Sequence, residues 1–438
     1  MQGRPNPAQS TNDEYLKLNI RLSVPIEPYD GYELMDLNTS TVWSAPLSGS
    51  GNTITQLFPI LPGWALIQAS MGDKAYVTHL NQVYCSECPG QTNCYYYIDN
   101  QAEATPAMSI EMAPGVVPDV NSAMTQGNSG VFRANFELSA FGELNLQIAT
   151  GTDQSPVWLL AGVAAAPPFA VNGGFPDTSF IHAQVNPRSL AGSLGTLASV
   201  DITLFPPSGL DMDLGDINYR NGFPASYKNI VFAEWGLPVE LIVPVGGSNY
   251  AGQLTGYISM NSVTAPSANR PISPLLGPVT NLSLDLADVF SSPLTGTSLT
   301  PKLTWNPPTL GDASFYQVDL LQFQVGQCLM EVCAVPSNVA TFQTQQNSLE
   351  LPPGVLMPAS TYVVVVTAKN AVASDLNSAP LRTTYPFTYA DTVSQPFTTA
   401  GTGPADVVAA ARTSYGPLVR NRKNVEKDNS GVTAMKNQ

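Results

Sequence analysis

The sequence predicts an all-β protein built from tandem β-sandwich domains, and three observations lead to this. Charged residues make up only 12% of the 438 residues, while Pro (38) and Gly (34) are both frequent. Apolar residues recur with period two in many short segments, which is typical of strands with one buried face. Long runs of Ala, Leu, Glu and Lys, which would predict helices, are almost absent. Many short strands joined by Pro, Gly and Asn turns therefore indicate an all-β fold.

The N-terminal part is predicted as a flexible polar lead over residues 1–14 and a β-sandwich domain over residues 15–128. Leu16 and Leu18 open an alternating strand that Pro25 stops. This domain also carries a Cys-rich hairpin. Because no signal peptide precedes the lead, we expect a removed N-terminal signal, with a lipid-bearing cysteine, to anchor the natural protein at an outer membrane.

The stretch near residues 16–75 carries a hairpin pattern, L-x-D-x-x-T-x-x-V, followed by an L-P-G strand. It resembles a prealbumin-like, carboxypeptidase-regulatory-like β-sandwich. The residues that fit the family pattern are Leu34, Asp36, Thr39, Val42, Leu61, Pro62, Gly63 and Ala69. Ser40, Ala65 and Ile67 depart from it. The resemblance implies a sandwich fold here.

A second β-rich domain is predicted over residues 129–263. Val200, Ile202 and Leu204 show the clearest period-two pattern in it. Residues 264–277 are rich in Pro and Ser and are predicted to be a linker. No known family is indicated for the second domain.

The segment 356–370, "LMPASTYVVVVTAKN", predicts a buried central strand. β-Branched residues at nearly every position favour an extended chain, because their stiff side chains pack well on a pleated surface. With period two, Tyr362, Val364, Val366 and Ala368 point one way, while Thr361, Val363, Val365 and Thr367 point the other.

Residues 278–400 form the third predicted domain, followed by a mostly disordered tail, 401–438. Trp305 precedes a proline pair, and a Leu-x-Pro-x-x-x-Tyr corner ends at Tyr362. Over residues 275–400 the chain resembles a fibronectin type III domain. That resemblance implies an immunoglobulin-like sandwich with Trp305 and Tyr362 in its core. The last strand is predicted either near Leu381–Thr384 or at Pro396–Thr399.

The five cysteines predict disulfide bonds in an oxidising compartment. We expect a bond between Cys328 and Cys333 and another between Cys88 and Cys94, with Cys85–Cys94 as the alternative to the second. One thiol is then left over, which points to intermolecular pairing. A zinc site made by His79 with Cys85, Cys88 and Cys94 is the other interpretation of this segment.

Other candidate sites are few. Asp211, Asp213 and Asp216 resemble the start of a calcium loop, although they fail the EF-hand pattern, and a solvated acidic loop is the alternative. Tyr95, Tyr96 and Tyr97 could stack on sugars or pack at a strand edge. Neither histidine lies in a nucleophile motif, so no catalytic residue and no cofactor other than calcium are predicted.

These observations predict a non-enzymatic, extracellular or cell-surface protein of bacterial type. We expect a structural, adhesive or assembly module whose partner is a protein or a cell-surface polymer, and homo-oligomers are an option. The net charge of −15 argues against nucleic acid as a partner. The alternative is a carbohydrate-binding accessory part of an extracellular hydrolase.

Overall fold

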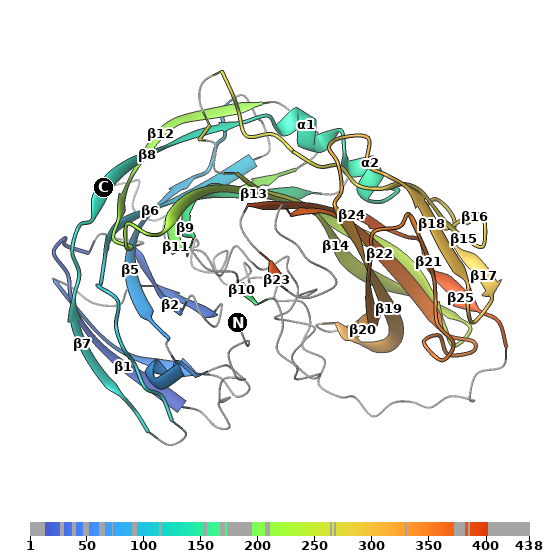
Figure 1. Cartoon of the computed structure of the whole chain (residues 1–438), viewed down its shortest axis with the longest axis horizontal. Coiled ribbons are helices and arrows are strands. Elements are labelled where there is room, and N and C mark those ends of the chain that lie inside the picture. The colour runs from blue at the N-terminus through green and yellow to red at the C-terminus, as the bar shows by residue number, and fades with distance from the viewer. Residues whose placement is uncertain are drawn as a thin grey trace, which may run out of the picture.

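The computed structural model describes most of the chain between residues 14 and 401. The described ranges are 14–26, 30–36, 41–46, 52–60, 66–71, 73–89, 94–113, 116–151, 156–166, 171–172, 195–205, 211–262, 265–266, 269–328, 331–371, 382–383 and 386–401. Apart from Glu14 and Gly401, the predicted lead and tail lie outside these ranges. In the described part the chain is almost entirely β, and its sheets form an arch (Figure 1).

A two-layer sandwich forms the N-terminal end of the arch. One layer has the order β4 (Thr53–Ile60), β1 (Glu14–Arg21), β7 (Asp119–Ala123), with β1 and β7 parallel. The other contains β3 (Thr41–Pro46), β2 (Gly31–Asp36) and β5 (Ala75–Cys85). Strands β2 and β3 pair as the hairpin that the sequence predicted.

Alternation along β1 builds the core of this sandwich. Leu16, Leu18 and Ile20 are fully buried against Leu34 and Val77 of the facing layer. A short 3₁₀ turn, η1 (Ala69–Met71), lies beside this core. The predicted first strand therefore has the buried face that its period implied.

The middle of the arch is a long antiparallel sheet that continues from the N-terminal sandwich without interruption. From β5 it runs through β6 (Cys94–Ala104), β11 (Gly195–Leu204), β9 (Val157–Ala166), β13 (Lys228–Val245) and β14 (Ser248–Ser262). Strand β6 pairs with β5 on one edge and with β11 on the other. The first two predicted domains consequently share one sheet.

A two-stranded ribbon covers the outer side of this sheet (Figure 1). It consists of β8 (Asn128–Phe136) and β12 (Met212–Asn221), and the short helices α1 (Leu138–Gly142) and α2 (Asn145–Ile148) follow β8. Phe132, Phe136 and Phe141 pack from this side onto Leu159 and Trp235 of the sheet. The largest hydrophobic core of the molecule lies here.

The C-terminal end is an immunoglobulin-like β-sandwich. One layer has the order β16 (Ala287–Asp288), β15 (Thr280–Leu284), β18 (Lys302–Asn306), β21 (Ser348–Glu350). The facing layer contains β17 (Leu294–Thr297), β25 (Phe397–Thr399), β22 (Thr361–Ala371), β19 (Phe315–Cys328) and β20 (Glu331–Thr344). Trp305 and Tyr362 both lie in the core between the layers.

The position beside β22 is shared by two strands. β24 (Phe387–Val393) pairs with residues 365–371 of β22, and β25 pairs with Thr361 and Tyr362. The Pro396–Thr399 alternative for the last strand is thus the one that adjoins β22. Arg382–Thr383 instead forms β23, which pairs with β10 (Val171–Asn172).

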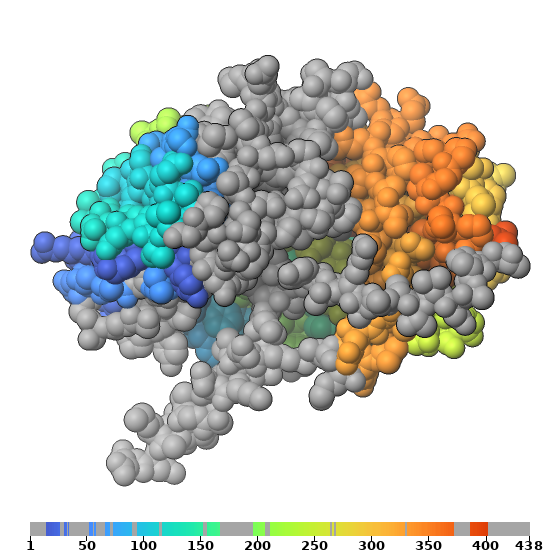
Figure 2. All heavy atoms as spheres, turned by 90° about the horizontal axis from the view of Figure 1, so that it is seen from below, coloured from blue at the N-terminus to red at the C-terminus, as the bar shows by residue number. Residues whose placement is uncertain are grey.

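The C-terminal sandwich is joined to the middle sheet along two seams. β24 pairs with β14 as well as with β22, and β20 meets β14 at the bridge between Gly252 and Ala334. A Cβ at Gly252 would lie 2.8 Å from a Val243 methyl carbon and 3.1 Å from the Phe323 ring, so this close approach needs glycine. The two ends of the molecule are well separated in Figure 2, yet one sheet path connects them.

The predicted linker 264–277 is packed in its second half, although Ala265, Asn269, Arg270 and Leu275 are exposed. Ile272 donates its backbone N–H to Asn135 and accepts from Glu137, and both Ile272 and Leu276 are buried. This stretch therefore fixes the C-terminal sandwich against the ribbon rather than tethering it loosely.

Candidate functional site

Four aromatic side chains gather on the inner side of the arch and form what we call the aromatic platform: Tyr84 and Phe205, which are exposed, and Tyr95 and Tyr97, which are half-buried. The ring centroids of Tyr84 and Tyr97 are 4.9 Å apart, and Tyr95 lies 6.1 Å from Tyr97 and 6.3 Å from Phe205. Tyr84 is 48% exposed and Phe205 is 43% exposed. Exposed clusters of large aromatic rings are unusual on soluble proteins and mark binding surfaces.

Strand register assembles the platform from three separate segments. Tyr84 of β5 is directly opposite Tyr97 of β6, and Tyr95 is opposite Thr203 of β11, two residues before Phe205. Residues two apart on a strand share a face, so the four rings point the same way. Gln82 and Asp99 continue this face and are joined by a 2.8 Å hydrogen bond.

Tyr96 is not part of the platform, although the sequence grouped it with Tyr95 and Tyr97. It points to the opposite face and packs against the large core. Burial and a hydrogen bond with the Cys85 thiol raise the pKa of Tyr96 to about 12. The correction follows from the period-two geometry of β6, which sends neighbouring side chains to opposite faces.

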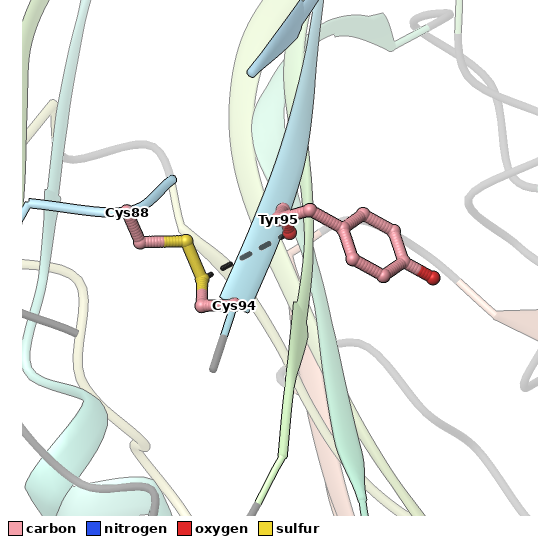
Figure 3. The surroundings of a disulfide bond; sticks show 3 residues. All are labelled: Cys88, Cys94 and Tyr95. Carbon is pink, nitrogen blue, oxygen red and sulfur yellow. Dashed lines mark hydrogen bonds between the residues drawn. A yellow bond between two sulfur atoms is a disulfide. The ribbon is translucent and has the colours of Figure 1, made fainter. Parts of the chain in front are cut away.

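The disulfide Cys88–Cys94 closes the β5–β6 hairpin next to the platform, with 5.6 Å between its Cα atoms. Figure 3 shows the Tyr95 ring projecting from the side of β6 opposite to this bond. Cys85 is the free thiol and is half-buried. The bond ties down the turn and so restricts the motion of the strands that carry Tyr84 and Tyr95.

The platform is the exposed end of a row of side chains that crosses nine strands. In register order the row is Tyr84, Tyr97, Asp201, Leu160, Glu234, Ser259, Tyr389, Lys369 and Phe315. At its buried end the Tyr389 hydroxyl donates to Glu234 over 3.0 Å, and Lys369 donates to Gln317 over 2.6 Å. At the other end of the row Tyr84 is exposed and Tyr97 is half-buried.

His79 lies at the centre of a buried charge cluster that sequence reasoning missed. Its Nε2 is 2.9 Å from Asp30 and its Nδ1 is 3.1 Å from Glu103, and the side chains of all three are at least 98% buried. Glu103 also accepts from the backbone N–H and hydroxyl of Ser23. A histidine between two carboxylates uses both ring nitrogens as donors, which is the imidazolium form.

The electrostatics of the cluster follow from this geometry. Burial alone lowers the pKa of His79, but the hydrogen bonds to Glu103 and Asp30 outweigh it and raise the pKa above 6.5. Burial raises the pKa of Glu103, and the bonds from His79 and Ser23 more than offset this, leaving it below 4.5. The cluster is a structural ion network inside the N-terminal sandwich.

The positions of His79, Cys88 and Cys94 contradict the zinc interpretation. Both ring nitrogens of His79 face carboxylates, while Cys88 and Cys94 are bonded to each other. Within the described ranges, no three side chains of His, Cys, Asp or Glu come together in a way that could hold a metal ion.

The three predicted calcium ligands are directed to different partners. Asp213 and Asp216 pair with Arg133, whereas Asp211 accepts from the backbone N–H and the hydroxyl of Ser139. Asp213 and Asp216 lie on strand β12, and Asp211 directly precedes it.

The other predicted residues are placed as follows. Cys328 and Cys333 are bonded at the tip of the β19–β20 hairpin, with 5.8 Å between their Cα atoms. Tyr362 accepts a 2.8 Å hydrogen bond from the Met357 backbone N–H, which is the bond a tyrosine corner makes. Trp305 contacts Tyr316 edge-on at 5.4 Å. His182 lies outside the described residues.

The chain was compared with protein families, curated proteins and solved structures. No protein-family model matches the chain, and no curated protein does. Among solved structures, the crystal structure of the chicken CNTN1 FN1–FN3 domains is 9% identical, with 89% of this chain and 99% of that chain covered, at a TM-score of 0.16. A score of that size carries no argument about fold or function. Among the described residues, no helix has the length and apolar character needed to span a bilayer.

Proposed function

We propose that this protein is a non-enzymatic module of the cell exterior that attaches to a cell-surface polysaccharide through the aromatic platform. The single observation that carries the proposal is the cluster of Tyr84, Tyr95, Tyr97 and Phe205 on one sheet face, with Tyr84 and Phe205 exposed. Such rings offer flat apolar surfaces that match the C–H faces of sugar rings, and their hydroxyl groups can bind sugar hydroxyls.

The surroundings of the platform suit a long, uncharged ligand. Gln82 and Asp99 lie beside the rings and supply an amide and a carboxylate for hydroxyl groups. The platform lies on a strand surface with Tyr84 and Phe205 exposed, which suits contact with a polymer. Because the chain carries a net charge of −15, an anionic polymer would be repelled at long range.

An exterior location is supported by the cysteines. Two disulfides in one chain are typical of proteins that fold in an oxidising compartment. The C-terminal sandwich adds support for a fibronectin type III-like assignment, since its two layers and the bond from Met357 to Tyr362 have the arrangement which that resemblance implies. Modules of this kind commonly present surfaces to partners, an argument by analogy alone.

The second candidate is a carbohydrate-binding accessory part of an extracellular hydrolase. The same platform favours it, because substrate attachment and cell-surface attachment need the same chemistry. The two differ in whether a catalytic centre acts on the bound polymer.

A glycan array combined with a hydrolysis screen on the bound polysaccharides tests the proposal. We expect binding to one or more neutral polysaccharides and no release of reducing ends from them. If the chain bound protein partners only, the proposal of a polysaccharide ligand would be contradicted. If the purified chain released sugars, the proposed non-enzymatic role would be contradicted.

A further inference from the structure

A second surface feature, on the face of β5 and β6 opposite to the platform, is a cleft where the β8–β12 ribbon meets these strands. Its volume is about 470 Å³, within the range of about 300–1,000 Å³ of small-molecule sites. Asn81 and Asn100 form its floor, and Asn218, Arg220 and Gln126 are among the residues of its walls.

Strand pairing brings the amides of this cleft together. Asn81 and Asn100 are directly opposite each other on β5 and β6. The Asn100 amide donates to the Asn218 backbone carbonyl over 3.1 Å, which spans from the sheet to the ribbon. Asn218 is an exposed residue that lines the cleft.

Close packing of the ribbon end holds the cleft in shape. A Cβ on Gly130 would lie 2.3 Å from the Tyr219 ring, so only glycine lets that ring lie against β8. The Tyr219 hydroxyl accepts from Asn229 over 3.2 Å, which fixes the ring from its other end. The cleft is therefore largely preformed rather than created by ligand binding.

The polar groups of the lining residues indicate which class of ligand the cleft can bind. Asn81, Asn100, Gln101, Gln126 and Asn218 are the lining residues that carry amides, and each amide offers donors next to an acceptor. Among the lining residues, all of them in the described part of the chain, none carries a carboxylate, and Arg220 is the one charged side chain. Vicinal hydroxyl groups need adjacent donors and acceptors, and an uncharged ligand leaves no buried charge unpaired.

We propose that this cleft is a second binding site, separate from the platform, that takes a small neutral saccharide. Neutral sugars satisfy the amides of Asn81, Asn218 and Gln126 through their hydroxyls, and Arg220 donates to a hydroxyl or ring oxygen. The proposal does not depend on polysaccharide attachment by the platform.

Saturation-transfer NMR on the full chain tests it with glucose, galactose, N-acetylglucosamine, maltose, cellobiose and glucuronate, each at about 5 mM, where weak sites are populated. We expect saturation transfer to at least one neutral sugar. The exchanges Asn218→Asp and Arg220→Ala, both at exposed positions, should weaken that binding about tenfold each, because each removes donors. Asn249→Asp, an equally exposed change on the distant β13–β14 turn, should leave it unchanged.

Each outcome decides the matter. Absence of transfer to every neutral sugar overturns the proposal, as does binding that is unaffected by both cleft exchanges. Tighter binding of glucuronate than of glucose overturns the proposal that the ligand is uncharged. If Tyr84→Ala, but neither cleft exchange, abolishes sugar binding, the cleft is refuted while the platform stands. If polysaccharides fail to bind but small sugars bind through Asn218, the platform fails and the cleft stands.

Discussion

His79 links two buried carboxylates in the N-terminal sandwich. It links Asp30 to Glu103, and Glu103 in turn holds the backbone of Ser23. A buried charge that loses its partner costs far more than the pair contributes, because the remaining charge cannot be solvated. Sequence reasoning could not find the cluster, since its members are 24 and 49 residues apart.

The cluster predicts a specific dependence of stability on pH. Because the pKa of His79 is raised on folding, its contribution is full below about pH 6.5 and is lost as pH rises through the folded-state pKa. Because the pKa of Glu103 is lowered, its contribution is full above about pH 4.5 and is lost as pH falls through the folded-state pKa.

Replacing His79 tests this dependence. We expect His79→Gln to lower the free energy of unfolding of the N-terminal sandwich by about 3–5 kcal/mol near pH 6. By about pH 9 the gap between the two proteins should narrow, because wild type alone loses the imidazolium. Urea unfolding at both pH values measures the two free energies of unfolding. A difference between wild type and His79→Gln that stays constant or increases would contradict the imidazolium form of His79.

Trp305 and Tyr362 should act through the stability of the C-terminal sandwich. Trp305→Ala removes a buried ring and should cost about 3–5 kcal/mol, and Tyr362→Phe loses the bond from Met357 and should cost about 1–1.5 kcal/mol. Trp305→Phe is the matched control, since the indole N–H makes no hydrogen bond and only ring volume is lost. An unchanged denaturation midpoint for Trp305→Ala would refute the core position.

Among single residues, those with a local signal were the ones predicted. Cys328 and Cys333 are close in sequence, and Tyr362 carries a corner pattern, so spacing alone located them. Tyr95, Tyr96 and Tyr97 stood out as a run of aromatic residues, but Tyr84 and Phe205 join Tyr95 and Tyr97 only through strand pairing. Pairing across strands is not encoded in local periodicity.

At the scale of elements, the β22 strand behaved as its period predicted. Tyr362, Val364 and Val366 face the sandwich core, while Val363 and Val365 face the large core shared with the middle sheet. A strand buried on both faces needs no polar residues, which is why four consecutive valines occur. The β24 strand was not predicted, because a run such as Phe387–Val393 shows no alternation when both of its edges and faces are covered.

The bond between Cys328 and Cys333 should shape its hairpin more than it stabilises the domain. The loop it closes is short, so its removal should cost less than the roughly 3 kcal/mol expected for a fifteen-residue loop. Mass spectrometry of the unreduced, alkylated peptide should show a bridged, unmodified pair, and Cys328→Ser with Cys333→Ser should lower stability only slightly. Free alkylation of both thiols in protein from an oxidising compartment would refute the bond.

The whole molecule is organised by sheet continuity, which the predicted boundaries at 128/129 and 264–277 do not show. Composition marks Pro- and Ser-rich stretches as breaks, but backbone hydrogen bonding across β6–β11 and β14–β24 carries the sheet past them. The all-β class and the presence of β-sandwiches were within reach of the sequence. The strand pairs that join the predicted domains could not be predicted, because the sequence of a single strand does not show which other strands it pairs with.

This continuity predicts cooperative behaviour between the middle sheet and the C-terminal sandwich. Val363 and Phe323 of the sandwich lie in the same core as Trp235 of β13. Trp305→Ala should therefore reduce amide hydrogen-exchange protection in β13 as well as in β18. Loss of protection in β18 with β13 unchanged would show that the two units unfold independently.

Attachment of the intact chain to a polysaccharide, measured as depletion from solution by the polymer that the array selects, tests the central claim most directly. Tyr84→Ala combined with Phe205→Ala should weaken attachment at least about tenfold, because two stacking rings are lost. Tyr84→Phe keeps the aromatic ring and should retain most of the attachment to the polysaccharide. The platform would be refuted if the double exchange bound as well as wild type, or if Tyr84→Phe were as weak as Tyr84→Ala.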